Sequence, residues 1–169
     1  MKIYSLTLDK ITNRMVFHKA ITTVFGLGFA PFAPGTFGAL GAILFYYILM
    51  YFHIDLTTVQ LLTLIVTTTL LGVWSTKKVI PEWGDDPSKV VVDEFVGILV
   101  TMLFIPVTHT NLWLAFVLFR FFDILKPLGI RTVDQKLKNA WGVMLDDVLA
   151  GVYACGVLHL IIYVLGRFG

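Results

Sequence analysis

The sequence predicts an all-α membrane protein: a polytopic helix bundle of about four to five spanning helices, with a broken, Gly- and Pro-rich re-entrant segment near the N-terminus. Three observations support this prediction. Hydrophobic residues make up 57% of the 169 residues and charged residues only 14%, whereas soluble domains are about 45–50% apolar and about 25% charged. Several apolar stretches approach the roughly 20 residues that a spanning helix needs. Nearly all basic residues fall at alternate ends of these stretches, and the length fits one membrane-embedded domain, 1–169.

The N-terminal elements are the least regular. Residues 1–20 carry charged side chains and no continuous apolar core, so we expect no cleavable signal peptide and an interfacial or disordered segment. The stretch 26–41, GLGFAPFAPGTFGALG, is apolar, but Pro31 and Pro34 prevent a regular helix. Non-helical backbone at membrane depth persists only where it is buried in protein or lines a polar cavity. The broken segment is therefore a candidate part of a functional site.

The expected spans follow one another along the rest of the chain, at residues 37–53, 57–76, 91–107, 110–125 and 145–166. Two short connections, 53–56 and 106–111, contain no Lys or Arg, and of the basic residues only Arg167 shares their side. Loops rich in Lys and Arg stay in the cytoplasm. We therefore expect the N-terminus and the long polar loops to face the cytoplasm.

Composition argues against several other classes of protein. The formal net charge is +2 and there is no basic run, so nothing supports a nucleic-acid partner. The single cysteine, Cys155, leaves no disulfide framework. We expect His53 and His109 on the outer side and His159 deep in the last span, which is a poor arrangement for a soft-metal site.

Acidic side chains give the main functional signal, because ten of the eleven fall on the predicted cytoplasmic side. Three helix ends carry eight of these ten, within 85–97, 120–134 and 142–151. Carboxylates within a membrane usually face the bundle interior, and a glycine four residues after both Asp93 and Asp147 would let the helices approach closely. We therefore expect one pocket that holds five carboxylates: Asp93, Glu94, Asp123, Asp146 and Asp147.

Five carboxylates in a small volume need cations, because like charges repel. Oxygen ligands of this kind suit Mg2+, which commonly binds phosphate as well, so all five are predicted metal ligands. Arg120 and Lys126 lie three residues before and after Asp123, and Arg131 follows the turn at Pro127. A metal ion with basic side chains is suited to holding a phosphoryl group and stabilising its transfer.

Each part of this pattern also has a structural alternative. Asp146 and Asp147 would be favoured at a helix N-terminus by the helix dipole. Arg120 and Asp123 would form a structural ion pair, and the break before Thr36 would be a plain kink with that residue as the N-cap. None of these alternatives explains why three acidic helix ends share one side of the membrane.

Four motifs follow one another from about residue 26 to residue 151: PFAPGTFGALGA, DPSKVVVDEFVG, RFFDILKP followed by IRTVD, and GVMLDDVLAG. This combination resembles the phosphatidylglycerophosphatase A family. The resemblance implies a multi-pass enzyme of the bacterial inner membrane with its active site facing the cytoplasm. It implies Mg2+-dependent hydrolysis of the phosphomonoester of phosphatidylglycerophosphate, which gives phosphatidylglycerol and phosphate.

The resemblance also implies residue roles. The predicted catalytic residues are Asp93, Glu94, Asp123, Lys126, Asp146 and Asp147. The predicted substrate-binding residues are Thr36, Arg120, Lys126 and Arg131, and Asp134 also falls on a motif position. The chain departs from the family pattern at Gly129, where a second proline is common, and at Ala39, where the family has serine. Neither departure removes a carboxylate, so we expect both to affect how the substrate is bound rather than whether the chain is active.

We predict metal-assisted hydrolysis, with phosphate bound by Lys126, Arg131 and backbone N–H groups of the loop at Gly35 and Thr36. Water is favoured over a phospho-aspartate intermediate, because no second motif singles out one aspartate as nucleophile. Two rival functions remain. A CDP-alcohol-type phospholipid transferase would need an Asp-Gly-x2-Ala-Arg core, which is missing. A divalent-cation transporter would need carboxylates near the membrane centre rather than at one interface. The oligomeric state is not predicted.

Overall fold

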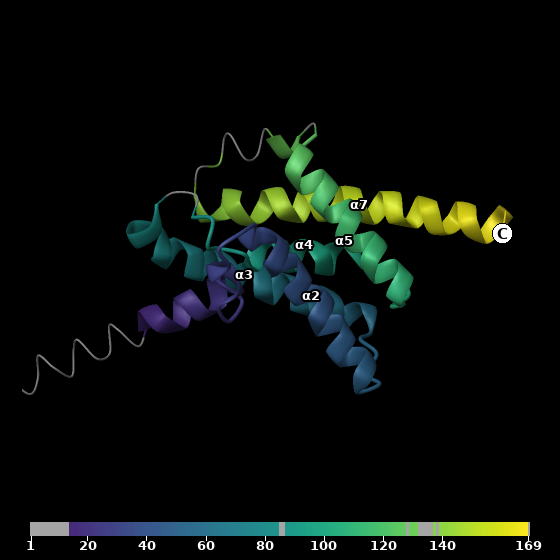
Figure 1. The fold of residues 1–169 in the computed structure, drawn as a ribbon, viewed down its shortest axis with the longest axis horizontal. Coiled ribbons are helices and arrows are strands. Elements are labelled where there is room, and N and C mark those ends of the chain that lie inside the picture. Colours follow the sequence, from purple (N-terminus) through teal and green to yellow (C-terminus); the bar gives the residue numbers. More distant parts are fainter. Residues whose placement is uncertain (1–13, 85–86, 128, 132–136, 138, 169) are drawn as a thin grey trace, which may run out of the picture.

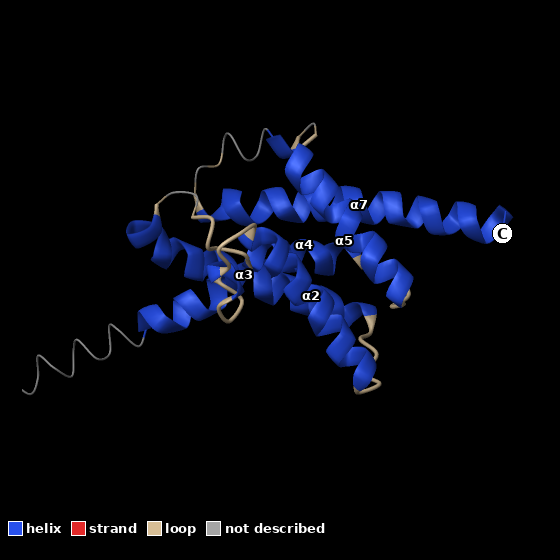
Figure 2. Ribbon diagram, in the orientation of Figure 1, coloured by secondary structure: helices blue, strands red, loops and turns tan. Residues whose placement is uncertain are grey.

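The computed structural model of the chain describes residues 14–84, 87–127, 129–131, 137 and 139–168. Within these residues every regular element is a helix (Figures 1 and 2). A helical stretch at 14–22 precedes η1 (Leu27–Phe29), α2 (Pro34–Tyr51), α3 (Thr58–Trp83), α4 (Val92–Thr101), α5 (His109–Leu125) and α7 (Ala140–Phe168). The all-α prediction is confirmed for the part of the chain described.

Three of the described helices, α2, α3 and α7, are long and apolar enough to cross a membrane. The membrane class of the chain is therefore supported, but the predicted four to five spans are not confirmed. Of the other two helices at predicted spans, α5 has 17 residues, fewer than the roughly 20 that a spanning helix needs. Helix α4 has ten residues, which at a rise of about 1.5 Å each is about half of the hydrocarbon thickness. The span expected at 91–107 is interrupted, because α4 ends at Thr101 and Phe104 turns the chain with a left-handed φ of 61°.

The segment 26–41 divides into short pieces rather than forming one helix. It contains η1, a left-handed residue at Ala33 with φ 45°, and the start of α2 at Pro34. Proline is favoured at the first helical position, where its missing N–H has no intrahelical partner. The predicted break is confirmed, whereas a re-entrant path through the membrane is not.

The short helix α4 lies inside the bundle and contacts α2, α3, α5 and α7 (Figure 1). Glycines allow this close packing. A Cβ added at Gly97 would lie 2.1 Å from Cε2 of Phe119, and one added at Gly151 would lie 2.6 Å from the carbonyl oxygen of Gly97. The Thr101 hydroxyl donates a hydrogen bond to the Gly97 oxygen at 2.8 Å and lies 3.4 Å from the Gly151 oxygen. The predicted role of both glycines in close helix approach is confirmed.

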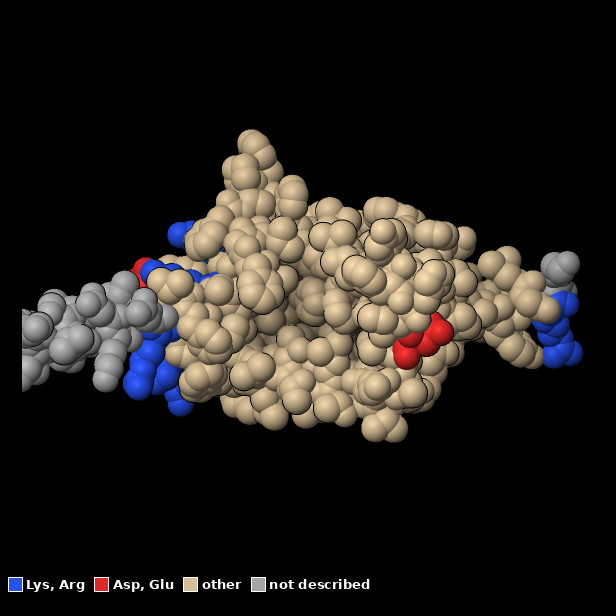
Figure 3. Space-filling model, turned by 90° about the horizontal axis from the view of Figure 1, so that it is seen from below, with Lys and Arg blue, Asp and Glu red and all other residues tan. Residues whose placement is uncertain are grey.

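Charged side chains are segregated along the molecule. On the face drawn in Figure 3, most basic side chains gather at one end, and a broad uncharged belt separates them from an acidic patch and from the basic side chains at the C-terminal end. Arg167 lies in the last turn of α7 at that far end. This distribution agrees with the alternation of basic residues seen in the sequence.

Candidate active site

A cavity of about 740 Å³ opens beside the first turn of α4; we call it the acidic cavity. Its wall comes from the N-terminus of α2, the loop before α4, the C-terminal end of α5 and the first turns of α7. Seven predicted site residues line it: Asp93, Glu94, Arg120, Asp123, Lys126, Asp146 and Asp147. The three acidic helix ends therefore meet, as the sequence predicted.

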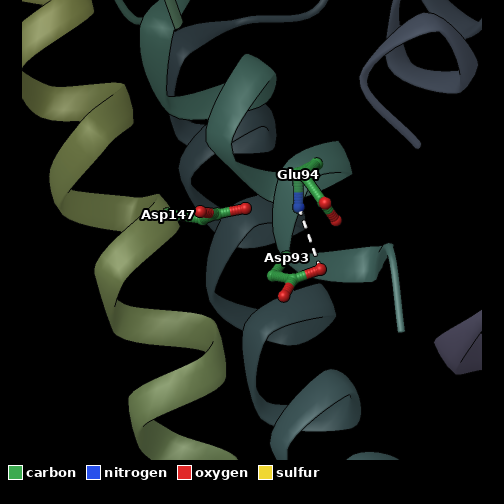
Figure 4. Close-up of side chains that lie close together, drawn as sticks. All are labelled: Asp93, Glu94 and Asp147. Atoms are coloured by element: carbon green, nitrogen blue, oxygen red, sulfur yellow. Dashed lines mark hydrogen bonds between the residues drawn. The ribbon is translucent and has the colours of Figure 1, made fainter. Parts of the chain in front are cut away.

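Three carboxylates form the centre of this cavity, which we call the carboxylate core: Asp93, Glu94 and Asp147 (Figure 4). One oxygen from each lies within 4.8 Å of the others. Asp93 and Asp147 are 7% and 4% exposed. The backbone N–H of Glu94 donates to Oδ1 of Asp93 at 3.1 Å. Oε2 of Glu94 is buried and finds no hydrogen-bond donor among the described residues.

The carboxylate core is electrostatically unfavourable as three bare anions. Asp93 and Glu94 belong to α4, which lies outside the three candidate spans. Burial raises the pKa of Asp93 well above its ordinary range, and the charge of Glu94 raises it further. Burial also raises the pKa of Glu94. The N-terminus of α4 favours negative charge, but buried carboxylates this close together stay ionised only with a cation among them.

Two further carboxylates in the acidic cavity are paired with basic side chains. Arg120 contacts Asp123 from one turn away on α5. Nζ of Lys126 donates to Oδ2 of Asp146 at 2.7 Å. Lys126 ends α5 in the left-handed region with φ 43°, a conformation that non-glycine residues adopt rarely and that often marks a functional site. The ion pair of Arg120 with Asp123, which was predicted as a structural alternative, is therefore present, and it lies in the cavity wall.

Gly35 is a site residue that the sequence reasoning did not single out for this role. A Cβ added there would lie 2.0 Å from Oε1 of Glu94 and 3.1 Å from Nη1 of Arg120. Gly35 is the second residue of α2, so the positive end of that helix lies against the Glu94 carboxylate. The sequence predicted a contribution of Gly35 through its backbone N–H, together with Thr36, and not through the absence of a side chain.

The structure does not bring two of the predicted substrate-binding residues into the acidic cavity. Thr36 and Arg131 are not among the described residues that line it. The Thr36 N–H donates to the Ala33 oxygen at 2.9 Å within the first turn of α2, so this N–H is already paired within the helix. Thr36 is not the N-cap either, since that position belongs to Ala33. Asp134 lies outside the described residues.

The start of α7 also differs from the prediction. The helix begins at Ala140, and its first turn contains no acidic residue. Asn139 precedes it, and Oδ1 of this side chain accepts from the backbone N–H groups of Trp141 at 2.9 Å and Gly142 at 3.2 Å. An asparagine cap of this kind satisfies the first N–H groups of the helix. Asp146 and Asp147 come later in α7, so their position is not explained by a helix-start preference.

The donor set of the carboxylate core suits a hard divalent cation. All three groups offer oxygen, and opposite ligands of an octahedral Mg2+ lie about 4 Å apart, close to the 4.8 Å envelope of the core. Arg120 and Lys126 lie in the wall of the same cavity. The arrangement can hold a cation and an anionic group side by side, as phosphoryl chemistry requires.

Comparison with known proteins gives a consistent set of relatives. The family model described as phosphatidylglycerophosphatase A matches residues 20–162. A Bacteroides thetaiotaomicron protein named putative phosphatidylinositol-3-phosphatase is 46% identical over 151 residues, which cover 86% of this chain and 94% of that protein. Phosphatidylglycerophosphatase A of Haemophilus influenzae is 41% identical over 143 residues, 82% of this chain and 85% of the relative. The Escherichia coli K12 protein of the same name is 36% identical over 141 residues, 81% and 78% of the two chains. No solved structure matches the chain.

Proposed function

Because the chain belongs to the phosphatidylglycerophosphatase A family and is therefore a phosphatase, we propose that it hydrolyses the phosphomonoester of phosphatidylglycerophosphate at the cytoplasmic face of a bacterial inner membrane. The products are phosphatidylglycerol and inorganic phosphate. The observation that supports this proposal most is the carboxylate core beside two basic side chains in one cavity. The basic residues at one end of the molecule support the cytoplasmic orientation.

Mg2+ is the proposed cofactor. Asp93, Glu94 and Asp147 would hold it, since their oxygens converge and Oε2 of Glu94 is buried without a donor among the described residues. Bound there, it would supply charge neutralisation for the phosphate and activation of a water molecule. Asp123 and Asp146 were also predicted as metal ligands. Each is paired with a basic side chain in the cavity wall. We therefore assign Asp123 to orienting Arg120, and Asp146 to orienting Lys126.

The basic side chains bind the phosphate in this proposal. Lys126 and Arg120 lie in the cavity wall and are each held by a carboxylate, which fixes the direction of their N–H groups. Donors held in advance stabilise developing negative charge better than donors that must reorganise. Arg131 is exposed and outside the described lining, so it takes no part in this grip. A water molecule is the proposed nucleophile, and a carboxylate of the cavity accepts its proton.

The acyl chains of the substrate would stay in the bilayer. Ile124 lines the acidic cavity and is 69% exposed, and the neighbouring Leu125 is 59% exposed. The cavity therefore adjoins an apolar surface on α5. A lipid can place its phosphate in the cavity while its chains cover this surface, because apolar side chains at the mouth suit hydrocarbon better than water.

Phosphatidylinositol 3-phosphate is a second candidate substrate, favoured by the name of the Bacteroides thetaiotaomicron relative. The test is phosphate release by the purified full chain from phosphatidylglycerophosphate, phosphatidylinositol 3-phosphate and phosphatidic acid, each with Mg2+ and with EDTA. We expect the highest kcat/KM with phosphatidylglycerophosphate and no release in EDTA. Faster release from the inositol lipid would replace the proposed substrate. Mg2+ flux in proteoliposomes without phosphate release from any lipid would favour the transporter alternative.

A further inference from the structure

A second cavity, of about 560 Å³, lies on the other side of α4; we call it the apolar cavity. Val92 and Phe95 line it, whereas the two residues between them, Asp93 and Glu94, line the acidic cavity. Helices α2 and α3 and the segment before η1 supply the rest of its wall. No charged side chain is among its described lining residues, and Thr68 is the single polar one. A cavity with so few polar partners does not hold ordered water well.

The short helix η1 connects the apolar cavity to a polar surface. Leu27 lines the cavity. A Cβ added at Gly28 would lie 2.0 Å from the backbone oxygen of Lys89, so the two backbones are in close contact. The ring of Phe29 lies edge-on to Trp83, with 6.1 Å between the centroids. Successive residues of one turn therefore join the rim of the cavity to the residues around Trp83.

Two lysines share the Trp83 ring, and we call Lys19, Trp83 and Lys89 the lysine–tryptophan cluster. Each ammonium nitrogen lies 5.5 Å from the ring centroid. Lys19 is also paired with Glu82 at 2.5 Å, so two positive charges face one negative charge. Indole rings of this kind prefer the membrane–water interface. The cluster therefore combines net positive charge with a ring that favours the region of the lipid phosphates.

The residues before η1 have a conformation that displays an aromatic side chain. Val24 and Phe25 both have left-handed φ values, 46° and 56°, which cost energy for a β-branched or bulky residue. Backbone N–H groups hold the turn, since Val24 donates to the Ile21 oxygen at 3.1 Å and Phe25 to the Ala20 oxygen at 2.8 Å. As a result Phe25 is 90% exposed at the edge of the apolar cavity. Beside an apolar cavity, such a side chain extends the surface that can contact hydrocarbon.

We propose that the apolar cavity and the lysine–tryptophan cluster together bind one anionic phospholipid that is not the substrate. One acyl chain fills the apolar cavity, and the lipid phosphate lies between Lys19 and Lys89. Hydrocarbon is the favoured occupant because each methylene that leaves water adds favourable free energy, and the positive charge of the cluster selects an anionic headgroup over a zwitterionic one. The site does not depend on which lipid the acidic cavity hydrolyses.

The bound lipid would also support the active site. The backbone N–H of Val91, immediately before α4, donates to the Thr22 oxygen at 2.8 Å. The segment that carries Lys19 and Phe25 is thus tied to the chain two residues before Asp93. A ligand that binds only the folded chain raises its apparent stability. We therefore expect the lipid to raise the thermal unfolding temperature as well as to bind.

The test is native mass spectrometry of the purified full chain in detergent, titrated with phosphatidylserine or with phosphatidylcholine of the same acyl chains. Phosphatidylserine is neither substrate nor product of the proposed reaction. Two variants remove the two halves of the site: Lys89→Gln removes a cation, and Thr68→Phe fills the apolar cavity. Their matched controls are Lys77→Gln and Thr67→Phe, both at exposed positions of α3 outside the described lining of the cavity.

The expected result is one bound phosphatidylserine in the unsubstituted chain and in both controls, with that copy lost in Lys89→Gln and in Thr68→Phe. If Thr68→Phe fails to fold, Thr68→Gln replaces it and is expected to lose the same copy, because a larger polar side chain would lie where the acyl chain binds. Equal binding of phosphatidylcholine overturns the proposed headgroup contact. Retention of the bound copy in Lys89→Gln or in the folded Thr68 variant overturns the site.

Discussion

Gly35 contributes to the candidate active site because it has no side chain and so leaves room for two neighbouring groups. Any larger residue would occupy the space that Oε1 of Glu94 and Nη1 of Arg120 now take. We expect Gly35→Ala to lower kcat/KM by about 100-fold, because a misplacement of about 1 Å at a catalytic group has an effect of that size. The measurement is phosphate release in Mg2+ together with thermal unfolding.

Gly156→Ala is the matched control for this prediction. Gly156 also lies within a helix, but a Cβ added there meets nothing within 4 Å. We expect this variant to keep its activity and to gain about 0.5–1 kcal/mol of stability from the better helix former. Equal activity of Gly35→Ala and Gly156→Ala would show that Gly35 does not position Glu94.

At the level of single residues, the sequence was informative about which side chains gather and about the local pair of Arg120 with Asp123, but not about pairs formed over longer separations. The clustering of acids on one side was visible because charge near a membrane is costly and therefore rarely accidental. The pairing of Lys126 with Asp146 joins residues 20 positions apart and depends on the left-handed turn at the end of α5. The contact of Gly35 with Glu94 is a steric fact of the tertiary structure, and no spacing in the sequence reports it.

Among the elements, the contact of α4 with α7 determines how far apart the acidic residues lie. We expect Gly151→Val to destabilise the protein by about 1–3 kcal/mol, the usual range for overpacking, because its Cβ would lie 2.6 Å from the backbone oxygen of Gly97. Activity should fall as well, since Asp147 lies one turn earlier on the same helix. The measurement is thermal unfolding with Gly156→Val as the control. Identical unfolding temperatures for the two variants would contradict tight packing at Gly151.

The docking of the 14–22 helix on α3 is expected to depend on pH. Nδ1 of His18 lies 3.2 Å from Oγ of Ser75, and its ring centroid lies 4.5 Å from that of Trp74. Burial lowers the pKa of His18 below its ordinary value of 6.5, and the charge of Lys78 lowers it further. When the folded-state pKa of a histidine is lowered, its full contribution to stability is present at a pH above the unfolded-state pKa. This contribution is lost as the pH falls from the unfolded-state pKa towards the folded-state pKa.

We therefore expect faster hydrogen exchange of residues 14–22 at pH 5.5 than at pH 7.5, after correction for intrinsic rates. The variant His18→Gln keeps a polar side chain but cannot titrate in this range, so it should show no such change. An equal pH response in the variant and the unsubstituted chain would assign the effect to another group.

The lengths of the elements were harder to predict than their type. The apolar run through 91–107 has the composition of a span, and no Gly or Pro marks the end of α4 at Thr101. The helix stops there because the chain must turn inside the bundle, which is a property of packing. The early start of α7 was also missed, because its signal is a single residue, Asn139, in a polar stretch.

For the molecule as a whole, the separation of charge predicts a fixed orientation in the membrane. In a Cys155→Ala background, Ser88→Cys places the only thiol at an exposed position of the acidic cavity, and Asp55→Cys places it at the opposite ends of α2 and α3. We expect a membrane-impermeant maleimide to label Ser88→Cys only in inverted vesicles and Asp55→Cys only in intact spheroplasts. Labelling of both from the same side would contradict the proposed orientation.

The most direct test of the central claim is Mg2+-dependent phosphate release from phosphatidylglycerophosphate by Asp93→Asn and Asp147→Asn, with Asp55→Asn as the control. Asn removes the charge but keeps the shape, and Asp55 lines a different cavity. Loss of electrostatic stabilisation at a reacting phosphate has an effect of about 100- to 1000-fold. We therefore expect both core variants to fold normally in detergent and to lose at least about 100-fold in activity. Their remaining activity should need a higher Mg2+ concentration than that of the unsubstituted chain. Full activity in both core variants, or undiminished activity of the unsubstituted chain in EDTA, would contradict the carboxylate core as a metal-dependent phosphatase site.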